Sequence, residues 1–183
     1  ATWAGLNESE IVDIAVSSQR KCGCTITGSM DDTWASMSSG WKLVDPKKSA
    51  LESIISEGKI EDEIIIFLIL RGSRSNIIEI NNFKEHSRIF ERALDSILND
   101  SIFQAISTNG MAVAAATEDD EAVRICNKLI ANGAIAAGIT GSGPAISVVS
   151  FIQDSETIRK VLYNSGYETI ETNFIDNNSL ELI

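Results

Sequence analysis

A glycine-rich segment from Gly138 to Ala145 has the residue types that can bind a charged ligand through the backbone. Three glycines and two hydroxyl residues lie within its first six positions. Without Cβ atoms the chain can come close to a ligand, and successive N–H groups can form a concave site for an anion. Glycine also marks ordinary tight turns. From the spacing alone, an anion-binding loop and a simple helix-to-strand turn before the buried strand at 145–149 both remain open.

Side chains that bind metals or act in hydrolysis are few in this sequence. There are three cysteines, Cys22, Cys24 and Cys126, and one histidine, His86. Four good zinc ligands are not available, so we expect no metal site. The single histidine is in an ordinary surface position, which argues against a hydrolase whose catalytic triad depends on histidine. An odd number of cysteines without dense spacing fits a reducing compartment.

Composition and charge narrow the class of protein further. The 183 residues, 44% of them hydrophobic, can form the core of one domain or of two small ones. The net charge of −11 opposes attraction to a polyanion, so we expect no nucleic-acid partner. No apolar run has the length of a membrane span, and residues 1–5 lack the pattern of a secretion signal. We therefore expect a soluble, cytoplasmic protein.

The N-terminal part of the chain shows helix signals. Asn7 and Glu10 have the spacing of a capping box, and Gly23 offers a stop after the apolar positions that follow. Ser29 is a candidate cap for a second helix, and Gly58 for the end of a third. The predicted elements are helices at 8–22, 29–40 and 49–57 and a strand at 41–44.

The C-terminal part mixes strands and helices. A short β-branched apolar run at 63–70 predicts a central strand buried on both faces. The other predicted elements are helices at 89–97, 102–116, 117–130 and 154–166 and strands at 145–151, 167–174 and 179–183. In the prediction, the helix that ends at 130 leads into the glycine-rich segment. This order indicates an α+β protein with helices packed on one face of a mainly antiparallel sheet.

Four segments together resemble the archaeal type of shikimate kinase, a member of the GHMP small-molecule kinases. They are, in order, Thr27 to Asp32, Ser36 with Ser39-Gly40, Asn109-Gly110, and Gly138 to Ala145. The resemblance spans the whole chain. The glycine-rich segment is shared in variant form with homoserine kinase and other GHMP members, so it identifies the superfamily rather than the substrate. The Thr-Gly-x-x-Asp-Asp segment is the more discriminating one.

The resemblance implies a GHMP kinase fold of the α+β class. Residues 1–58 would be the remnant of a ribosomal-S5-like N-terminal domain, which carries nucleotide binding and catalysis, and residues 59–183 a ferredoxin-like C-terminal domain. The lysine-bearing first motif of the family and its Pro-x-x-x-Gly-Leu-x-Ser-Ser motif do not occur in this sequence. The chain thus looks like the C-terminal portion of such an enzyme. We expect a further N-terminal portion to pack on residues 1–58 and the isolated chain to be inactive.

The chemistry implied by the resemblance is transfer of the ATP γ-phosphoryl group to a hydroxyl of shikimate, with Mg²⁺ as a cofactor. A carboxylate that orients or deprotonates the hydroxyl should be Asp31 or Asp32. The capping-box spacing from Ser29 to Asp32 would leave Asp31 for catalysis. The distance to Ser36 instead puts Asp32 where related kinases carry their catalytic aspartate, and we favour Asp32. Without the resemblance, both aspartates would be an ordinary acidic helix N-terminus.

The resemblance also places the glycine-rich segment in a wall of the active site. The residues expected to contact phosphate or substrate are Thr27, Gly28, Asn109, Thr140, Gly141, Ser142 and Gly143. Each hydroxyl could instead bond its own turn, and Asn109 could mark a helix kink or a local cap. The carboxylate of shikimate would suit an arginine fork. Arg20, Arg71 and Arg74 are candidates by position, and the alternative for each is an exposed cation.

Three hypotheses follow from the sequence. The first is part of a shikimate kinase that uses ATP and Mg²⁺. The second is another GHMP kinase, such as homoserine kinase. The third is a non-catalytic GHMP homologue that acts as a binding module, which the absent N-terminal motifs would favour if they were also absent from the gene product.

Overall fold

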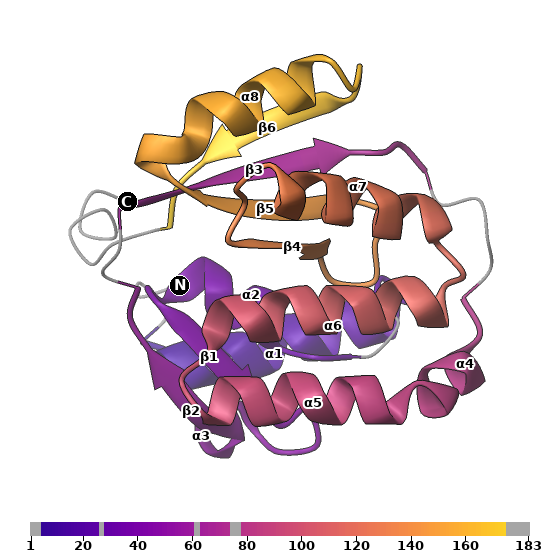
Figure 1. The fold of residues 1–183 in the computed structure, drawn as a ribbon. Coiled ribbons are helices and arrows are strands. Elements are labelled where there is room, and N and C mark those ends of the chain that lie inside the picture. The colour runs from indigo at the N-terminus through magenta and orange to yellow at the C-terminus, as the bar shows by residue number, and fades with distance from the viewer. Residues whose placement is uncertain (1–4, 26–27, 61–62, 74–77, 175–183) are drawn as a thin grey trace. The chain divides into compact units, whose positions relative to one another are not determined.

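The computed structural model describes residues 5–25, 28–60, 63–73 and 78–174. The described chain divides into two compact units: the first contains the residues up to 60 together with Phe174, and the second contains residues 63–173 (Figure 1). Each unit has its own hydrophobic core. In the described part of the chain, no helix combines the length and the apolar character that a bilayer span requires.

Helix α1 (Glu8–Cys22) confirms the first predicted helix. Its capping box is complete: the Asn7 side chain accepts from the Glu10 N–H at 3.0 Å, and the Glu10 carboxylate accepts from the Asn7 N–H at 2.8 Å. Gly23 ends the helix in the left-handed conformation, with a φ of +66° that glycine adopts at little cost. The buried residues Val12 and Val16 are one turn apart and face the core of the first unit.

The second helix of the first unit is shorter than predicted. Helix α2 (Asp31–Met37) begins after Met30, which occupies the N-cap position without a side-chain cap bond. Ser29, the predicted cap, therefore lies one position before the N-cap residue. Met30 is buried, with 2% of its surface exposed, and packs in the same core as Trp34. The start of α2 is thus anchored by the packing of Met30 in this core.

The predicted helix over 49–57 is wrong beyond its first turn. Helix α3 (Ala50–Ser53) is followed by strand β2 (Ile54–Gly58). This strand pairs antiparallel with β1 (Trp41–Val44), the strand that the sequence predicted. Two consecutive isoleucines begin β2, and β-branched residues favour a strand when a partner is available. The partner lies in another part of the sequence, so local spacing did not reveal it.

The second unit is a four-stranded antiparallel sheet with helices, in the order β4-β5-β3-β6. Its elements in chain order are β3 (Ile64–Leu70), α4 (Ile80–Glu85), α5 (Ser87–Leu98), α6 (Ile102–Ala116), α7 (Asp120–Ala131), β4 (Ala136–Ile139), β5 (Ile146–Phe151), a 3-10 turn (Ile152–Asp154), α8 (Ser155–Tyr163) and β6 (Glu168–Thr172). This arrangement of a strand, helices, two strands, a helix and a last strand is ferredoxin-like. The predicted α+β class and ferredoxin-like order are confirmed.

Strand β3 lies between β5 and β6, as predicted for a central strand. Ile65, Phe67 and Ile69 alternate onto one face and are buried in the core, where Phe67 is paired with Val148 of β5. The opposite face is only partly covered, since Ile66, Leu68 and Leu70 are of intermediate exposure. Burial on both faces, which the apolar run predicted, is therefore wrong for most of the strand.

Strand β4 was not predicted, and it changes the setting of the glycine-rich segment. The segment joins β4 to β5 as a β-hairpin loop, whereas the sequence predicted a helix-to-strand turn. The first three residues of β4 are small, and helix α6 lies against the strand at Gly138. A Cβ atom on Gly110 of α6 would come within 2.3 Å of the Gly138 Cα atom. The edge amide of Ala137 donates to the Ser107 hydroxyl of α6 at 3.2 Å.

The last described strand also differs from its prediction. The pattern at 167–174 predicted a half-buried strand, whereas all side chains of β6 are exposed. Helix α8 begins at Ser155 with Asp154 in the N-cap position, as predicted, although Asp154 makes no side-chain cap bond. The strand predicted over 179–183 lies outside the described residues.

Candidate functional site

The predicted site residues fall into two groups. Gly28, Asp31 and Asp32 belong to the first unit, and Asn109 and the loop residues from Thr140 to Gly143 belong to the second. Thr27 lies outside the described residues. Within the second unit, the segment of α6 next to Asn109 lies against the residues that precede Thr140.

Asp31 and Asp32 form the first turn of α2, and both are exposed. Their carboxylates complement the unpaired N–H groups of the helix N-terminus. The pKa of Asp32 is raised, first by partial desolvation and then by the negative charge of Asp31. A raised pKa moves a carboxylate toward the range that suits a general base. The capping-box argument for Asp31 no longer applies, because Met30 and not Ser29 precedes the helix.

Gly28 lies at a close contact with the end of α1. Its carbonyl accepts from the Arg20 guanidinium at 2.6 Å, and its N–H donates to the Thr25 hydroxyl at 2.9 Å. Gly28 has a φ of +67°, and a Cβ atom there would lie 2.6 Å from Arg20 Nε. The glycine is thus required by local structure. Arg20 also donates to the Pro46 carbonyl at 3.3 Å, so part of its guanidinium is used inside the unit.

The loop that joins β4 and β5 is held by two short-range hydrogen bonds. The Thr140 N–H donates to the Ala145 carbonyl and the Gly143 N–H to the Thr140 carbonyl, each at 3.0 Å. Gly141 and Gly143 have positive φ values, and the Gly143–Pro144 peptide bond is cis. Two of the amides in the loop are therefore engaged within it. The predicted run of successive donors is wrong at these two positions, and an anion site would need the other amides and the hydroxyls.

Asn109 lies on α6 beside the start of this loop. Its neighbour Gly110 meets the backbone of Gly138 and Ile139, the last residues before Thr140. Asn109 itself is exposed, and α6 continues without a break from Ile102 to Ala116. Asn109 is therefore not a buried amide, and the alternative of a local cap at this position is wrong. The proximity of this segment to the loop, however, brings together two of the segments that carried the resemblance.

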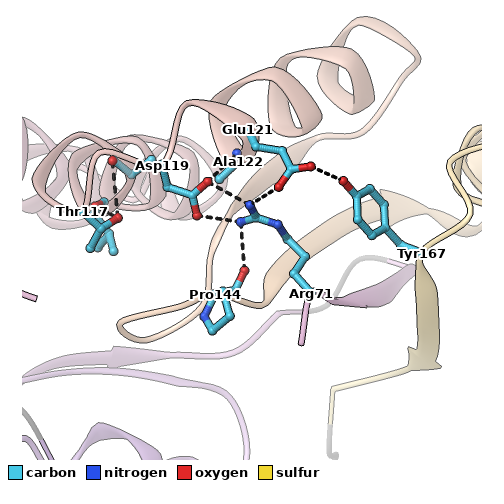
Figure 2. Close-up of polar contacts among 9 residues, drawn as sticks. Arg71, Thr117, Asp119, Glu121, Ala122, Pro144 and Tyr167 are labelled. Carbon is cyan, nitrogen blue, oxygen red and sulfur yellow. Dashed lines mark hydrogen bonds and ion pairs between the residues drawn. The ribbon is translucent and has the colours of Figure 1, made fainter. Parts of the chain in front are cut away.

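The buried side chain of Arg71 is hydrogen-bonded to the loop between β4 and β5. Arg71, directly after β3, donates through one terminal nitrogen to the Pro144 carbonyl at 3.1 Å and to Asp119 at 2.7 Å (Figure 2). Its other terminal nitrogen donates to Asp119 at 2.8 Å and to Glu121 at 2.7 Å. Only 7% of the Arg71 side chain is exposed. Glu121 in turn accepts from the Tyr167 hydroxyl.

These contacts shift the ionisation of the groups involved. The hydrogen bond from Arg71 is the main reason that the pKa of Asp119 is lowered. The pKa of Glu121 is also lowered, first by the Tyr167 hydrogen bond and then by Arg71. The pKa of Arg71 is raised, chiefly by its bond to Asp119. The network is thus a charged clamp with all its carboxylates ionised at neutral pH.

The role of Arg71 differs from both sequence interpretations. It is not an exposed cation, and its two terminal nitrogens are engaged by Asp119, Glu121 and Pro144 rather than directed at a ligand. Asp119, which was not among the predicted site residues, accepts through its carboxylate from the Ala122 N–H at 2.9 Å as the cap of α7. Its acidic character before a helix was the available signal. Arg74 lies outside the described residues.

Comparisons with known proteins agree with this architecture. Residues 82–164 match the family described as GHMP kinases C terminal. A shikimate kinase of Methanobrevibacter smithii is 27% identical over 178 residues, which are 97% of this chain and 60% of the relative. A shikimate kinase of Aeropyrum pernix is 26% identical over 155 residues, 85% of this chain and 54% of the relative. This chain therefore spans less than two thirds of the length of either relative.

A crystal structure of a mevalonate kinase has a similar fold, with a TM-score of 0.65 and 13% sequence identity over 94% of this chain and 58% of that one. At this identity the likeness concerns the fold alone. The predicted resemblance is confirmed: residues 82–164 match the GHMP kinase C-terminal family, and the chain has the GHMP kinase fold and sequence similarity to archaeal shikimate kinases.

Proposed function

We propose that this chain is part of an ATP-dependent shikimate kinase, which transfers the γ-phosphoryl group of ATP to a hydroxyl of shikimate. The observation that carries the proposal is the similarity to an archaeal shikimate kinase over 97% of the chain. The GHMP C-terminal domain and the fold support the same reaction class. Since the chain covers 60% of that relative, the activity is proposed for the whole protein that contains it.

Within this enzyme, Asp32 is the proposed carboxylate that orients or deprotonates the attacking hydroxyl. Its raised pKa and its accessible position in the first turn of α2 support that role. The negative charge of Asp31 contributes to the raised pKa of Asp32. Asp31 is also the alternative candidate for the catalytic carboxylate. Adjacent residues of a helix point about 100° apart, so one of the two would face the substrate.

The loop between β4 and β5 is the proposed wall of the phosphate and substrate site. Thr140 and Ser142 would donate hydroxyl hydrogen bonds, and Gly141 and Gly143 would let the backbone come close to a phosphate. Support comes from Gly141, where a Cβ atom would meet nothing within 4 Å, so the space above it is open. Asn109 is proposed as a further contact because its helix lies against the start of the loop. Thr27 and Gly28 are proposed by resemblance alone.

Two adjacent carboxylates of the chain are candidate ligands for Mg²⁺. In the described ranges, no cluster of three or more His, Cys, Asp or Glu side chains could hold a metal ion. In kinases Mg²⁺ usually takes one or two carboxylates, with phosphate oxygens and water as its other ligands. The neighbouring carboxylates of Asp31 and Asp32 fit this smaller requirement. Bound with ATP, Mg²⁺ would neutralise charge on the transferred phosphoryl group.

We also propose which domains of the enzyme the two parts of the chain form. Residues 1–58 would complete the catalytic N-terminal domain, on which a further N-terminal portion of the protein would pack, and residues 59–183 would form the C-terminal domain. ATP and shikimate would be the ligands, and the cytoplasm the compartment. The isolated chain would be inactive, because the phosphate-gripping motif of the family is not in its sequence.

The test is a phosphotransfer assay of the complete gene product with ATP and Mg²⁺. We expect ADP formation that depends on shikimate, with a kcat/KM at least about 100-fold above that for homoserine, since a polar substrate pocket rejects a poorly matched analogue strongly. Preference for homoserine would replace the proposal with the second GHMP candidate. Binding of neither ATP nor shikimate would favour a non-catalytic homologue.

The assignment of the carboxylate has its own matched pair of variants. Asp32→Asn should lower kcat by about 10²–10⁴-fold, the usual contribution of general acid–base catalysis. Asp31→Asn, at the adjacent exposed position, should lower kcat less than Asp32→Asn does, because it leaves the proposed catalytic carboxylate in place and removes a neighbouring charge and one candidate Mg²⁺ ligand. The reverse order of effects would assign the role to Asp31.

A further inference from the structure

Cys22 and Cys24 are exposed cysteines that the proposed kinase chemistry does not use. Only Gly23 separates them, and Cys22 is the last residue of α1. The helix end that carries them is ordered by two hydrogen bonds. The Gly23 N–H donates to the Arg20 carbonyl at 3.2 Å, and the Cys24 N–H donates to the Gln19 carbonyl at 3.0 Å. The spacing of the two thiols is therefore set by a defined turn.

This turn brings the cysteines within reach of a disulfide bond. Two Cα atoms with one residue between them are at most about 7 Å apart even in an extended chain. The left-handed dihedrals of Gly23 make the chain more compact than that. Disulfides span Cα distances of about 4.4–6.8 Å. The Cys24 Sγ atom lies 3.7 Å from the Cys22 carbonyl oxygen, so its thiol folds back toward Cys22.

We infer that Cys22 and Cys24 form a redox-active dithiol, which low-molecular-weight disulfides oxidise to an intramolecular disulfide. One cysteine, as its thiolate, attacks a disulfide R–S–S–R, forms a mixed disulfide with the protein and releases one thiol RSH. The second cysteine attacks the protein sulfur of that intermediate and displaces the other RSH. The protein loses two hydrogen atoms, and the small disulfide is reduced to two thiols.

The physical setting favours a reversible bond over a structural one. A cross-link around a single residue removes little conformational entropy from the unfolded chain, so it stabilises the fold much less than one that closes a long loop. Exposed or strained disulfides also have more oxidising potentials and form the labile class. The thiol pair therefore suits a modification that a cell can add and remove.

The disulfide would act next to a contact that joins the end of α1 to other segments of the same unit. Arg20, in the last turn of α1, holds the carbonyls of Gly28 and Pro46. A cross-link between Cys22 and Cys24 acts on this last turn, and so on the contact that holds Gly28. The inference does not rest on the proposed kinase activity.

Redox titration of the reduced chain tests the inference. The chain is equilibrated without oxygen at graded ratios of oxidised to reduced glutathione, quenched with an alkylating agent in denaturant and analysed by mass spectrometry. We expect the free thiols to fall from three to one, with a loss of two hydrogen atoms and a peptide that links Cys22 to Cys24. Dithiothreitol should restore all three thiols.

Three variants sharpen the result. Cys126→Ser should form the same disulfide over the same range of ratios, because Cys126 lies in the other unit. Cys22→Ser and Cys24→Ser should each stop at a glutathione adduct on the remaining cysteine. The inference is overturned if the unmodified chain keeps three free thiols at every ratio, or if it gives stable adducts or disulfide-linked dimers in place of the internal bond.

Discussion

Asp119 accepts hydrogen bonds from both terminal nitrogens of Arg71, at 2.7 and 2.8 Å, while the same carboxylate caps α7 through the Ala122 N–H. This pair therefore joins the end of β3 to the start of α7. Through the Pro144 carbonyl, Arg71 adds the loop between β4 and β5 to the same contact. A planar guanidinium can serve three elements at once because its donors form a rigid fork.

Removal of Arg71 should destabilise the second unit strongly. Arg71→Met keeps an apolar stem but leaves the Asp119 carboxylate unpaired in a site where it is only 19% exposed. We expect a loss of about 2–4 kcal/mol in the free energy of unfolding, toward the range for a broken buried pair. Urea unfolding of the chain, followed by circular dichroism, measures it.

Arg159 offers the matched control for that variant. It also binds two carboxylates, those of Glu156 and Glu171, but its side chain is 36% exposed. Arg159→Met should destabilise the chain clearly less than Arg71→Met does, because water screens exposed ion pairs. Equal losses for the two variants would show that the Arg71 contacts are no stronger than ordinary surface pairs.

The clamp should also contribute to stability in acid. The pKa values of Asp119 and Glu121 are both lowered in the folded chain. Such carboxyls stabilise the fold above their unfolded pKa values, near 4, and lose this contribution as the pH falls through the lower folded values. The free energy of unfolding should therefore decrease below about pH 4. Asp119→Asn should lessen that decrease in urea titrations at successive pH values, and an unchanged slope would contradict it.

Gly110 should tolerate no side chain. A Cβ atom there would lie 2.3 Å from the Gly138 Cα atom and 2.8 Å from the Ile139 nitrogen. Both of these are backbone atoms, which cannot rotate away as a side chain could. Gly110→Ala should cost about 3 kcal/mol or more, at the upper end of overpacking effects. Asn109→Ala, one position earlier and exposed, should change stability by no more than about 0.5 kcal/mol. Thermal unfolding of both variants is the measurement, and similar midpoints would refute the close approach.

Cys126 should be the least reactive of the three thiols. Burial raises its pKa to about 11. At pH 8 its reactive thiolate should be on the order of one part in a thousand. Alkylation by iodoacetamide, followed peptide by peptide, should therefore proceed much more slowly at Cys126 than at the exposed Cys22 and Cys24. In denaturant the three rates should converge, and equal rates in the folded chain would contradict the burial.

The elements predicted correctly are those whose signals are local. The capping box at Asn7 defines α1, and the β-branched run of β3 defines the central strand. Strand β2 was missed because it depends on pairing with β1, which the local sequence does not encode. Strand β4 was missed because its small residues, Gly138 among them, serve the approach of α6 and carry no strand signal.

The candidate site was predictable in part for the same reason. The sequence indicated which residues form the loop, since the glycines at 141 and 143 do adopt positive φ values. It did not indicate which of the loop amides are engaged, because Thr140 and Gly143 bond partners selected by the hairpin. The Arg71 clamp joins residues 48 positions apart along the chain, a contact that no local pattern encodes.

The crossing of α6 over β4 has a mechanical consequence. Gly110 and Gly138 meet without side chains between them, so there is no soft layer at that point to absorb a displacement. A tilt of the helix is passed directly to Gly138, two residues before Thr140. Substitutions in distant turns of α6, well away from any bound molecule, would therefore shift the position of the loop between β4 and β5.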